Sequence, residues 1–323
     1  MFPYIIIKPI KSEKGVKMKL RKLISLREET KGMISLYEEH FKICEYTTRE
    51  EIDLFLKHCS VEERQDLLLI AATNDTIRLG KEYGVATLGY SRPNQQVSSP
   101  SMENFLGGVE YVLESLEEVE SSFLEKVHQR YHQLPWTIAK TKRCIIRELS
   151  MEDVDTLFEL YQDKELTRYT EPLLEYEEEL NKQRAYIDHM YRYFGYGMWL
   201  VFLKDTGELI GRAGLEHRQI HASLTQNKEL DLSKEWESST VIELGYLIKS
   251  NYQGQGIATE VCQAILQYAE AELEIEELNC FIEEGNIPSV KLAESLGFSY
   301  VSTIVEQDRK MLRFIRKSHI IKH

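Results

Sequence analysis

Residues 243–260, ELGYLIKSNYQGQGIATE, join an apolar strand to a helix through a turn that contains two glycines. Glycine has no Cβ and adopts positive φ at little cost, so Gly254 and Gly256 allow a sharp turn and the close approach of a ligand. The backbone N–H groups after the turn point outward at the positive end of the helix dipole, which favours an anion such as a diphosphate. Two glycines alone are equally compatible with a tight turn that binds nothing.

The turn differs from two common phosphate-binding loops. A P-loop continues with Lys and then Ser or Thr, and the dinucleotide fingerprint has a third glycine. This sequence has neither feature, so both of those sites are excluded.

From Cys144 onward, strand and helix patterns alternate, with hairpins in the middle. Ser150 and Asp153 form a capping box that opens a helix after the first strand. Strands are expected at 144–149, 198–203, 208–215 and 240–249, a turn at 205–207 and a helix at 255–273. The pattern predicts an α/β domain over residues 143–318.

The chain before Pro135 is a second, smaller domain, residues 1–138. An amphipathic run at 113–132 predicts a helix that ends at Pro135. Residues 18–57 are expected to be mostly helical, with Thr48 as a cap.

Two apolar runs within this first domain, 67–72 and 85–90, flank a helix expected at 75–83 and closed by Gly84. A third run is expected at 111–113. Continuous apolar strands around a helix predict a parallel βαβ unit, and hence a Rossmann-like α/β domain.

Composition excludes several functional classes. Acidic residues outnumber basic ones 53 to 40, for a net charge of -13, which argues against nucleic-acid binding. No stretch is long enough for a membrane span, and the apolar stretch 2–7 is too short for a signal peptide. The scattered cysteines Cys44, Cys59, Cys144, Cys262 and Cys280 have no metal-ligand spacing. We expect a cytoplasmic protein without a metal, and without a nucleic-acid or membrane partner.

The glycine turn resembles the central motif of the GNAT superfamily of acetyl-CoA-dependent N-acetyltransferases, Gln/Arg-x-x-Gly-x-Gly/Ala. Gln253, Gly256 and Ala258 occupy its positions. A second match follows at 286–298, with the sequence NIPSVKLAESLGF, and the strand 242–246 is similar to the branch of ribosomal-protein N-terminal acetyltransferases. The resemblance covers the C-terminal half and implies a mixed, mostly antiparallel sheet flanked by helices.

The resemblance also implies how acetyl-CoA is held. The diphosphate would bind Gln253, Gly254, Gln255, Gly256, Ile257, Ala258 and Thr259. In the family, two strands splay apart and free N–H groups for the thioester and pantetheine, and the residues concerned here are Leu247 and Ile248. Asn286 would hydrogen-bond the pantetheine arm, and a helix N-cap is its local alternative.

Acetyl transfer needs an amine that has lost its proton, although an alkyl ammonium has a pKa of about 10.4. Glu243 is the expected base, acting through a water. The alternatives are that Glu243 is a solvated strand carboxylate, or that His217 is the base. The family usually places a tyrosine acid where this chain has Ala293. Ser289 is the nearest replacement, and protonation of the thiol by solvent is the other route.

Residues for the amine are less defined. The glutamates of the expected lid are Glu171, Glu175, Glu177, Glu178 and Glu179, and they either attract a cation or form a solvated face. An aromatic segment at 186–199 lies beside them. The expected reaction is direct transfer, in a ternary complex, to a peptide N-terminus or a small cationic amine, because no cysteine lies near the turn. A CoA-binding regulatory protein of weak activity is the alternative. The acceptor and a homodimer are left open.

The first domain has a short resemblance of its own. Residues 67–76, with Gly80 and Gly84, resemble the last acidic segment of haloacid-dehalogenase-like phosphatases. Only Asp75 and Asn74 remain as ligands there, and the Asp-x-Asp nucleophile is absent, since Asp53 lies in a helical stretch. We therefore expect a non-catalytic docking or regulatory domain.

Overall fold

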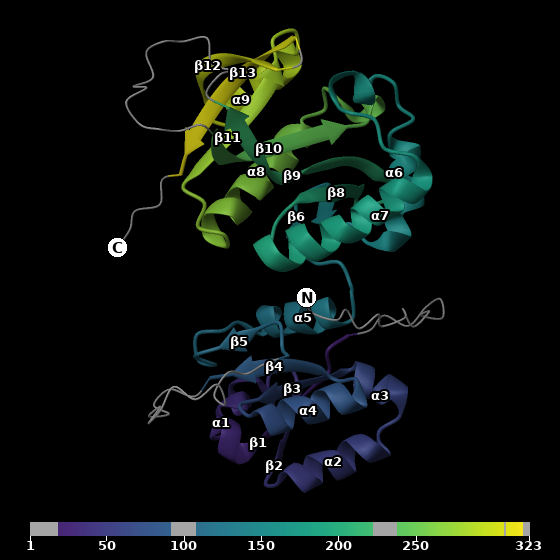
Figure 1. The fold of residues 1–323 in the computed structure, drawn as a ribbon, viewed down its shortest axis with the longest axis vertical. Coiled ribbons are helices and arrows are strands. Elements are labelled where there is room, and N and C mark those ends of the chain that lie inside the picture. Colours follow the sequence, from purple (N-terminus) through teal and green to yellow (C-terminus); the bar gives the residue numbers. More distant parts are fainter. Residues whose placement is uncertain (1–18, 92–107, 222–237, 307, 319–323) are drawn as a thin grey trace. The chain divides into compact units, whose positions relative to one another are not determined.

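The computed structural model describes residues 19–91, 108–221, 238–306 and 308–318. The chain forms two compact units, residues 1–134 and 135–323, each with its own sheet (Figure 1). Residues 2–7, the apolar stretch considered above, lie outside the described part. None of the described helices has the length and apolar character that a membrane span requires.

The N-terminal unit contains a five-stranded parallel sheet in the order β2-β1-β3-β4-β5. This is one of the two common orders of doubly wound α/β folds. The strands are β1 (Lys22–Leu26), β2 (Lys42–Tyr46), β3 (Leu67–Ala71), β4 (Ala86–Tyr90) and β5 (Val112–Leu113). The structure confirms the expected parallel α/β domain.

Helices cover both faces of this sheet. Leu67 and Leu69 of β3 pack in one hydrophobic cluster with residues of α2 and α4, whereas Leu68 and Ile70 pack in another with residues of α5. This explains why β3 is apolar at every position. The helices are α1 (Arg27–Thr30), α2 (Arg49–His58), α3 (Val61–Gln65), α4 (Asn74–Tyr83) and α5 (Ser121–Tyr131).

Local signals in this unit are confirmed where a side chain or a glycine sets a helix end. Thr48 accepts a hydrogen bond from the Glu51 N–H and completes a capping box at α2. Gly84 ends α4 with φ 67°, in the left-handed region that glycine tolerates.

Two predictions for this unit are wrong. Residues 18–57 are not mostly helical, because β1 and β2 lie among them. Both strands contain charged or polar residues, Lys22 and Ser25 in β1 and Lys42 and Glu45 in β2, so neither shows the continuous apolar run that identified β3. The expected helix at 113–132 begins only at Ser121, whereas the third strand expected at 111–113 is confirmed as β5 at the sheet edge.

The C-terminal unit contains an eight-stranded mixed sheet in the order β12-β13-β11-β10-β9-β8-β7-β6. Neighbours are antiparallel except β10 and β11, which are parallel. The strands are β6 (Thr137–Lys140), β7 (Cys144–Arg147), β8 (Met198–Leu203), β9 (Leu209–His221), β10 (Ser238–Ile248), β11 (Glu277–Glu283), β12 (Ser299–Glu306) and β13 (Arg309–Lys317). The expected mixed, mostly antiparallel sheet is confirmed.

One face of this sheet carries α8 (Figure 1). Trp199, Ala213 and Tyr246 are register neighbours on β8, β9 and β10, and the Trp199 ring packs edge-on against Tyr268 of α8, with 5.5 Å between centroids. The helices of this unit are α6 (Val154–Leu160), α7 (Tyr176–Tyr186), a π-helix (Ile187–Phe194), α8 (Ile257–Ala271) and α9 (Ile287–Ser295). The predicted capping box of Ser150 and Asp153 precedes α6.

The opposite face carries Glu216 and Glu243. Side chains alternate along a strand, so residues one position away from Leu215 and Leu244 point away from α8. Glu216 and Glu243 are register partners, and the Tyr186 hydroxyl of α7 donates to Glu216 at 3.0 Å. Glu216 and Glu243 therefore lie next to each other on the face of the sheet that α7 contacts.

Candidate active site

The parallel strands β10 and β11 pair at one position only, Glu243 with Asn279. On its other edge, β10 pairs with β9 along its whole length, up to Ile248. The two parallel strands therefore diverge after Glu243, and the end of β10 borders a gap in the sheet. Leu247 and Ile248, the residues expected to face the thioester and pantetheine, lie in this diverging part of β10.

The glycine turn follows directly. Gly254 has φ 70° and Gly256 has φ 74°, and Gly256 is the N-cap of α8, without a side-chain cap. A Cβ built on Gly254 would meet no atom within 4 Å, so the turn is open on that side. The first intrahelical bond runs from the Glu260 N–H to the Gly256 carbonyl.

These features fit a diphosphate. The N–H groups of a helix's first turn have no partner within the helix, and here they follow an open glycine surface. The neighbouring glutamines hold the turn from within: Gln253 Nε2 donates to the Ile248 carbonyl at 2.8 Å, and Gln255 Nε2 donates to the Asn251 carbonyl at 2.9 Å. Backbone amides, rather than these side chains, are thus the groups available to a ligand.

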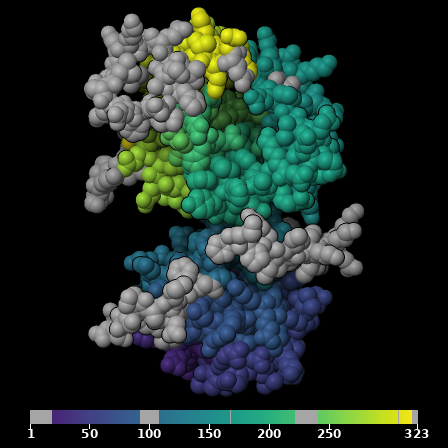
Figure 2. All heavy atoms as spheres, in the orientation of Figure 1, coloured from purple at the N-terminus to yellow at the C-terminus, as the bar shows by residue number. Residues whose placement is uncertain are grey.

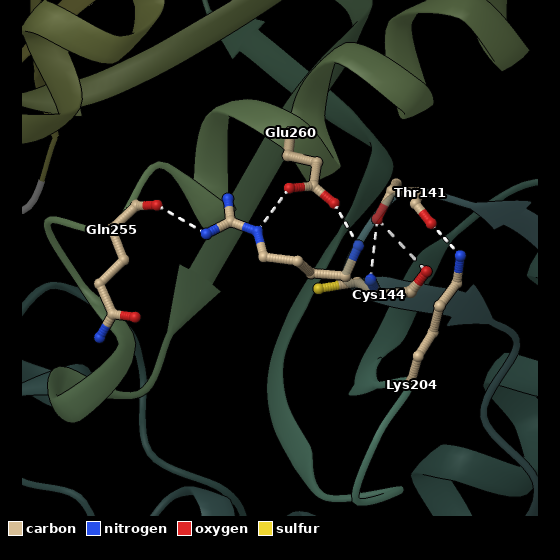
Figure 3. A network of polar contacts seen from close by, with 6 residues as sticks. Thr141, Cys144, Lys204, Gln255 and Glu260 are labelled. Carbon is tan, nitrogen blue, oxygen red and sulfur yellow. Dashed lines mark hydrogen bonds and ion pairs between the residues drawn. The ribbon is translucent and has the colours of Figure 1, made fainter.

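A network from the β6–β7 turn supports the glycine turn (Figure 3). Arg143 donates from its backbone N–H and its Nε to the two carboxylate oxygens of Glu260, both at 2.7 Å. Its Nη1 donates to the Gln255 carbonyl at 2.8 Å. Burial opposes ionisation of Glu260, but hydrogen bonds from Thr141 and Arg143 outweigh it and lower the pKa of this carboxyl group. Arg143 lies outside both family motifs, so its contact with the turn could not be predicted from the sequence.

Glu243 is not a solvated strand carboxylate. Its side chain is 20% exposed, and its Oε2 lies 2.9 Å from Nη1 of Arg218. Arg218 also pairs with Glu306 of β12, and its guanidinium lies 4.2 Å from the centroid of the Phe281 ring. Burial is the largest influence and raises the pKa of Glu243, although Arg218 partly offsets it. A carboxylate with a raised pKa is a stronger base than an ordinary glutamate.

Asn286 is the N-cap of α9, as its local alternative predicted. Its Oδ1 accepts the Ser289 N–H at 3.3 Å. The Tyr246 hydroxyl donates to the Ser289 carbonyl at 3.2 Å, and burial raises the pKa of this phenol. Ala293, at the position where the family places a tyrosine, is fully buried. Tyr246 thus brings a hydroxyl beside α9, which the motif comparison did not reveal.

Most of the lid glutamates form an exposed face. Glu177 and Glu178 are exposed, whereas Glu179 is buried, where its carboxylate accepts the Leu174 N–H at 2.9 Å and a bond from Gln183. Glu179 therefore stabilises the start of α7.

The aromatic segment divides into core and surface. Tyr191 and Trp199 are buried, whereas Tyr193 is 81% exposed. His217, the alternative base, lies 2.7 Å through its Nε2 from the Tyr196 hydroxyl. Figure 2 shows a hollow in the surface of the C-terminal unit, between the yellow residues of the β12–β13 hairpin and the teal residues of α6 and α7.

The described residues contain no group of three or more His, Cys, Asp or Glu side chains that could hold a metal ion.

Comparisons with known proteins agree on the C-terminal unit. Residues 143–299 match the family model "Acetyltransferase (GNAT) domain". The uncharacterized protein YkkB of Bacillus subtilis (strain 168) is 30% identical over 189 residues, which cover 56% of this chain and 98% of that protein. The uncharacterized N-acetyltransferase p20 of Bacillus licheniformis is 24% identical over 177 residues, 54% of this chain and 89% of p20.

Among solved structures, an acetyltransferase (GNAT family) from Bacillus anthracis aligns with a TM-score of 0.42 at 18% identity, over 55% of this chain and 96% of that one. The family model and YkkB, of which this chain covers nearly the whole length, establish the assignment. The chain therefore belongs to the GNAT family of acetyltransferases, with the family's domain in its C-terminal unit.

Proposed function

We propose that this enzyme transfers the acetyl group of acetyl-CoA directly to a primary amine while both substrates are bound. The observation that carries the proposal is the divergence of β10 from β11 after Glu243, together with the open turn at Gly254 and Gly256. When bound, acetyl-CoA supplies an acetyl group activated as a thioester. Residues 253–259 hold its diphosphate, and Leu247, Ile248 and Asn286 line its pantetheine arm.

Glu243 accepts the amine proton through a water. Its raised pKa and its position at the single β10–β11 pair, where the two strands separate, support this role. Arg218 and the backbone N–H of Phe281 both bond to the carboxylate and fix it. A carboxylate has about four lone-pair sites, so it can still accept a hydrogen bond from the water. Glu216, the register partner of Glu243, adds a second negative charge that attracts a cationic amine.

The proton donor for the leaving thiolate is a hydroxyl beside α9, from Ser289 or Tyr246. Ser289 is partly exposed, and Tyr246 stays protonated because burial raises its pKa. The variants Ser289→Ala and Tyr246→Phe separate the two, because only loss of the true donor lowers turnover without changing affinity for CoA.

Direct transfer is supported by the state of the cysteines in this unit. Burial raises the pKa of Cys144, Cys262 and Cys280, so none of them is a ready thiolate nucleophile. The other two, Cys44 and Cys59, belong to the N-terminal unit.

The proposed acceptor is a peptide N-terminus or a small cationic amine. Similarity of residues 242–246 to the ribosomal-protein branch favours a peptide amine, and the net charge of -13 favours a cationic acceptor. We further propose a cytoplasmic protein that acts without a nucleic-acid or membrane partner.

For the N-terminal unit, we propose a haloacid-dehalogenase-like remnant without phosphatase activity. The helix α4 starts at the crevice beyond β1 and β3, where doubly wound folds bind ligands. There the buried carboxylate of Glu29 accepts the Ala72 N–H and the hydroxyls of Thr73 and Thr76, each at 2.7 Å. The chain's own carboxylate thus takes the position that a bound anion would need.

A CoA-binding regulatory protein is the second candidate, favoured by the buried Ala293 in place of the family's acid. The test combines calorimetry with CoA and a screen of amines for acetyl-CoA-dependent thiol release. The enzyme should bind CoA and acetylate at least one amine class, and Glu243→Gln should lose most of that turnover while its affinity for CoA stays the same. Binding without turnover on any amine would favour the regulator, and no CoA binding would refute both.

A further inference from the structure

Arg143 lies outside the two family motifs, yet its guanidinium lies beside the glycine turn. Two of its side-chain nitrogens are engaged, Nε by Glu260 at 2.7 Å and Nη1 by the Gln255 carbonyl at 2.8 Å. The third, Nη2, lies 3.8 Å from the position that a Cβ on Gly256 would occupy. The side chain is 38% exposed, so this third nitrogen is within reach of a ligand at the turn.

Glu260 explains why an arginine is needed here. It lies in the first turn of α8, where its negative charge would repel an anion bound at the same helix end. Arg143 bonds both oxygens of that carboxylate, which neutralises it and fixes the guanidinium against the turn. The remaining N–H groups, those on Nη2, then lie beside Gly256, next to the backbone amides of the first turn of α8.

We propose that Arg143 binds a phosphate of the coenzyme through Nη2, and that it makes the enzyme select CoA thioesters over thioesters of pantetheine. The inference rests on the proposed function. A guanidinium forms strong charge-assisted hydrogen bonds with phosphate oxygens, which the neutral pantetheine arm lacks. Two groups carry that chemistry, the diphosphate and the 3′-phosphate of the adenosine.

The test is calorimetric titration of the wild-type enzyme and Arg143→Gln with CoA, 3′-dephospho-CoA and pantetheine. We expect Arg143→Gln to bind CoA about 10–100-fold more weakly, in keeping with the loss of a charge-assisted bond, and to bind pantetheine as before. Equal weakening for CoA and 3′-dephospho-CoA assigns the contact to the diphosphate, and weakening for CoA alone assigns it to the 3′-phosphate. Lys142→Gln, an exposed neighbour with the same loss of charge, is the matched control and should bind CoA as the wild type does.

A second measurement uses the unmodified enzyme, in case Arg143→Gln does not fold. Phenylglyoxal should modify Arg143, as detected by mass spectrometry, and CoA but not pantetheine should protect it. Unchanged CoA affinity in Arg143→Gln, an equal loss for CoA and pantetheine, or protection by both ligands alike would overturn the inference. Absence of CoA binding to the wild-type enzyme would instead overturn the proposed function.

Discussion

Replacement of Gly254 by alanine separates backbone strain from ligand binding, because the chain offers a matched control. Gly254 has φ 70° and Gly207, in the turn between β8 and β9, has φ 71°. At neither position would an added Cβ meet another atom within 4 Å. The two substitutions therefore impose the same conformational strain without a clash.

The expected cost in folding is small and equal. A non-glycine residue in the left-handed region costs roughly 1–2 kcal/mol, and restriction of the unfolded chain by alanine returns about 0.4–1 kcal/mol. Each variant should therefore lose about 1 kcal/mol of unfolding free energy. The effects on CoA should differ, because Gly254 lies in the proposed diphosphate site and Gly207 does not. Gly254→Ala should bind CoA at least about tenfold more weakly, equivalent to about 1.4 kcal/mol, whereas Gly207→Ala should bind it normally.

The assay pairs calorimetric titration with CoA and chemical unfolding of both variants. Two results would refute the reasoning. If Gly254→Ala binds CoA as the wild type does, the open side of the turn does not face the coenzyme. If Gly207→Ala loses the same affinity for CoA, the loss comes from a general change in the folded structure and gives no evidence that CoA binds at the turn.

Three further predictions concern titration and burial. Because the pKa of Glu243 is raised, turnover should decline from a higher pH than an ordinary glutamate would give as the solution is acidified, and a pH–rate profile without this acid limb would exclude Glu243 as the base. Glu29→Ala should cost the N-terminal unit about 3 kcal/mol in denaturant titrations, because it leaves buried donors unpaired, and a cost below about 1 kcal/mol would contradict this account of the carboxylate. His132 has its pKa lowered to about 4 by burial and by His128, so the folded state binds fewer protons than the unfolded state between pH 4 and 6.5. Stability should fall as pH drops through that window, by about 1 kcal/mol between pH 7.5 and 5 after allowance for partial exposure of the ring, and thermal unfolding of His132→Gln should show less of this loss.

Sequence predicted the parts of the fold that depend on a few adjacent residues. The turn at Gly254 and Gly256, the caps at Thr48 and Ser150, and the end of α4 at Gly84 all follow from the conformation or the hydrogen bonds of a single residue. Such features can be recognised from the local sequence without knowledge of the tertiary structure.

The missed strands depend on distant partners. In β1, Ser25 interrupts an apolar run between charged neighbours. In β2, Lys42 is exposed and the other four residues are half-buried. Their strand conformation is stabilised by pairing with β3 and by the helices on both faces, and local propensity alone does not predict it.

The ion pairs of the site could not be predicted from the sequence either. Arg143 and Glu260 are 117 positions apart, and Arg218 and Glu243 are 25 apart. No periodicity relates such pairs, because the sheet order decides which strands bring them together. The glycine turn and Glu243 could be selected from the sequence. The ion pairs that Arg143 forms with Glu260 and Arg218 forms with Glu243 were visible only in the fold.

In the proposed mechanism, Ala293 stands where the family usually has a tyrosine acid, so another group must supply the proton. Ala293 is fully buried in the core of the C-terminal unit and has no hydroxyl. We propose that the hydroxyl comes either from Ser289 of α9 or from Tyr246 of β10, which bonds the Ser289 carbonyl. Because β10 also carries Glu243, a donor at Tyr246 would place both the base and the acid on one strand. The relative position of the two groups would then be fixed by strand geometry rather than by the packing of α9, which explains how activity could persist without the usual tyrosine.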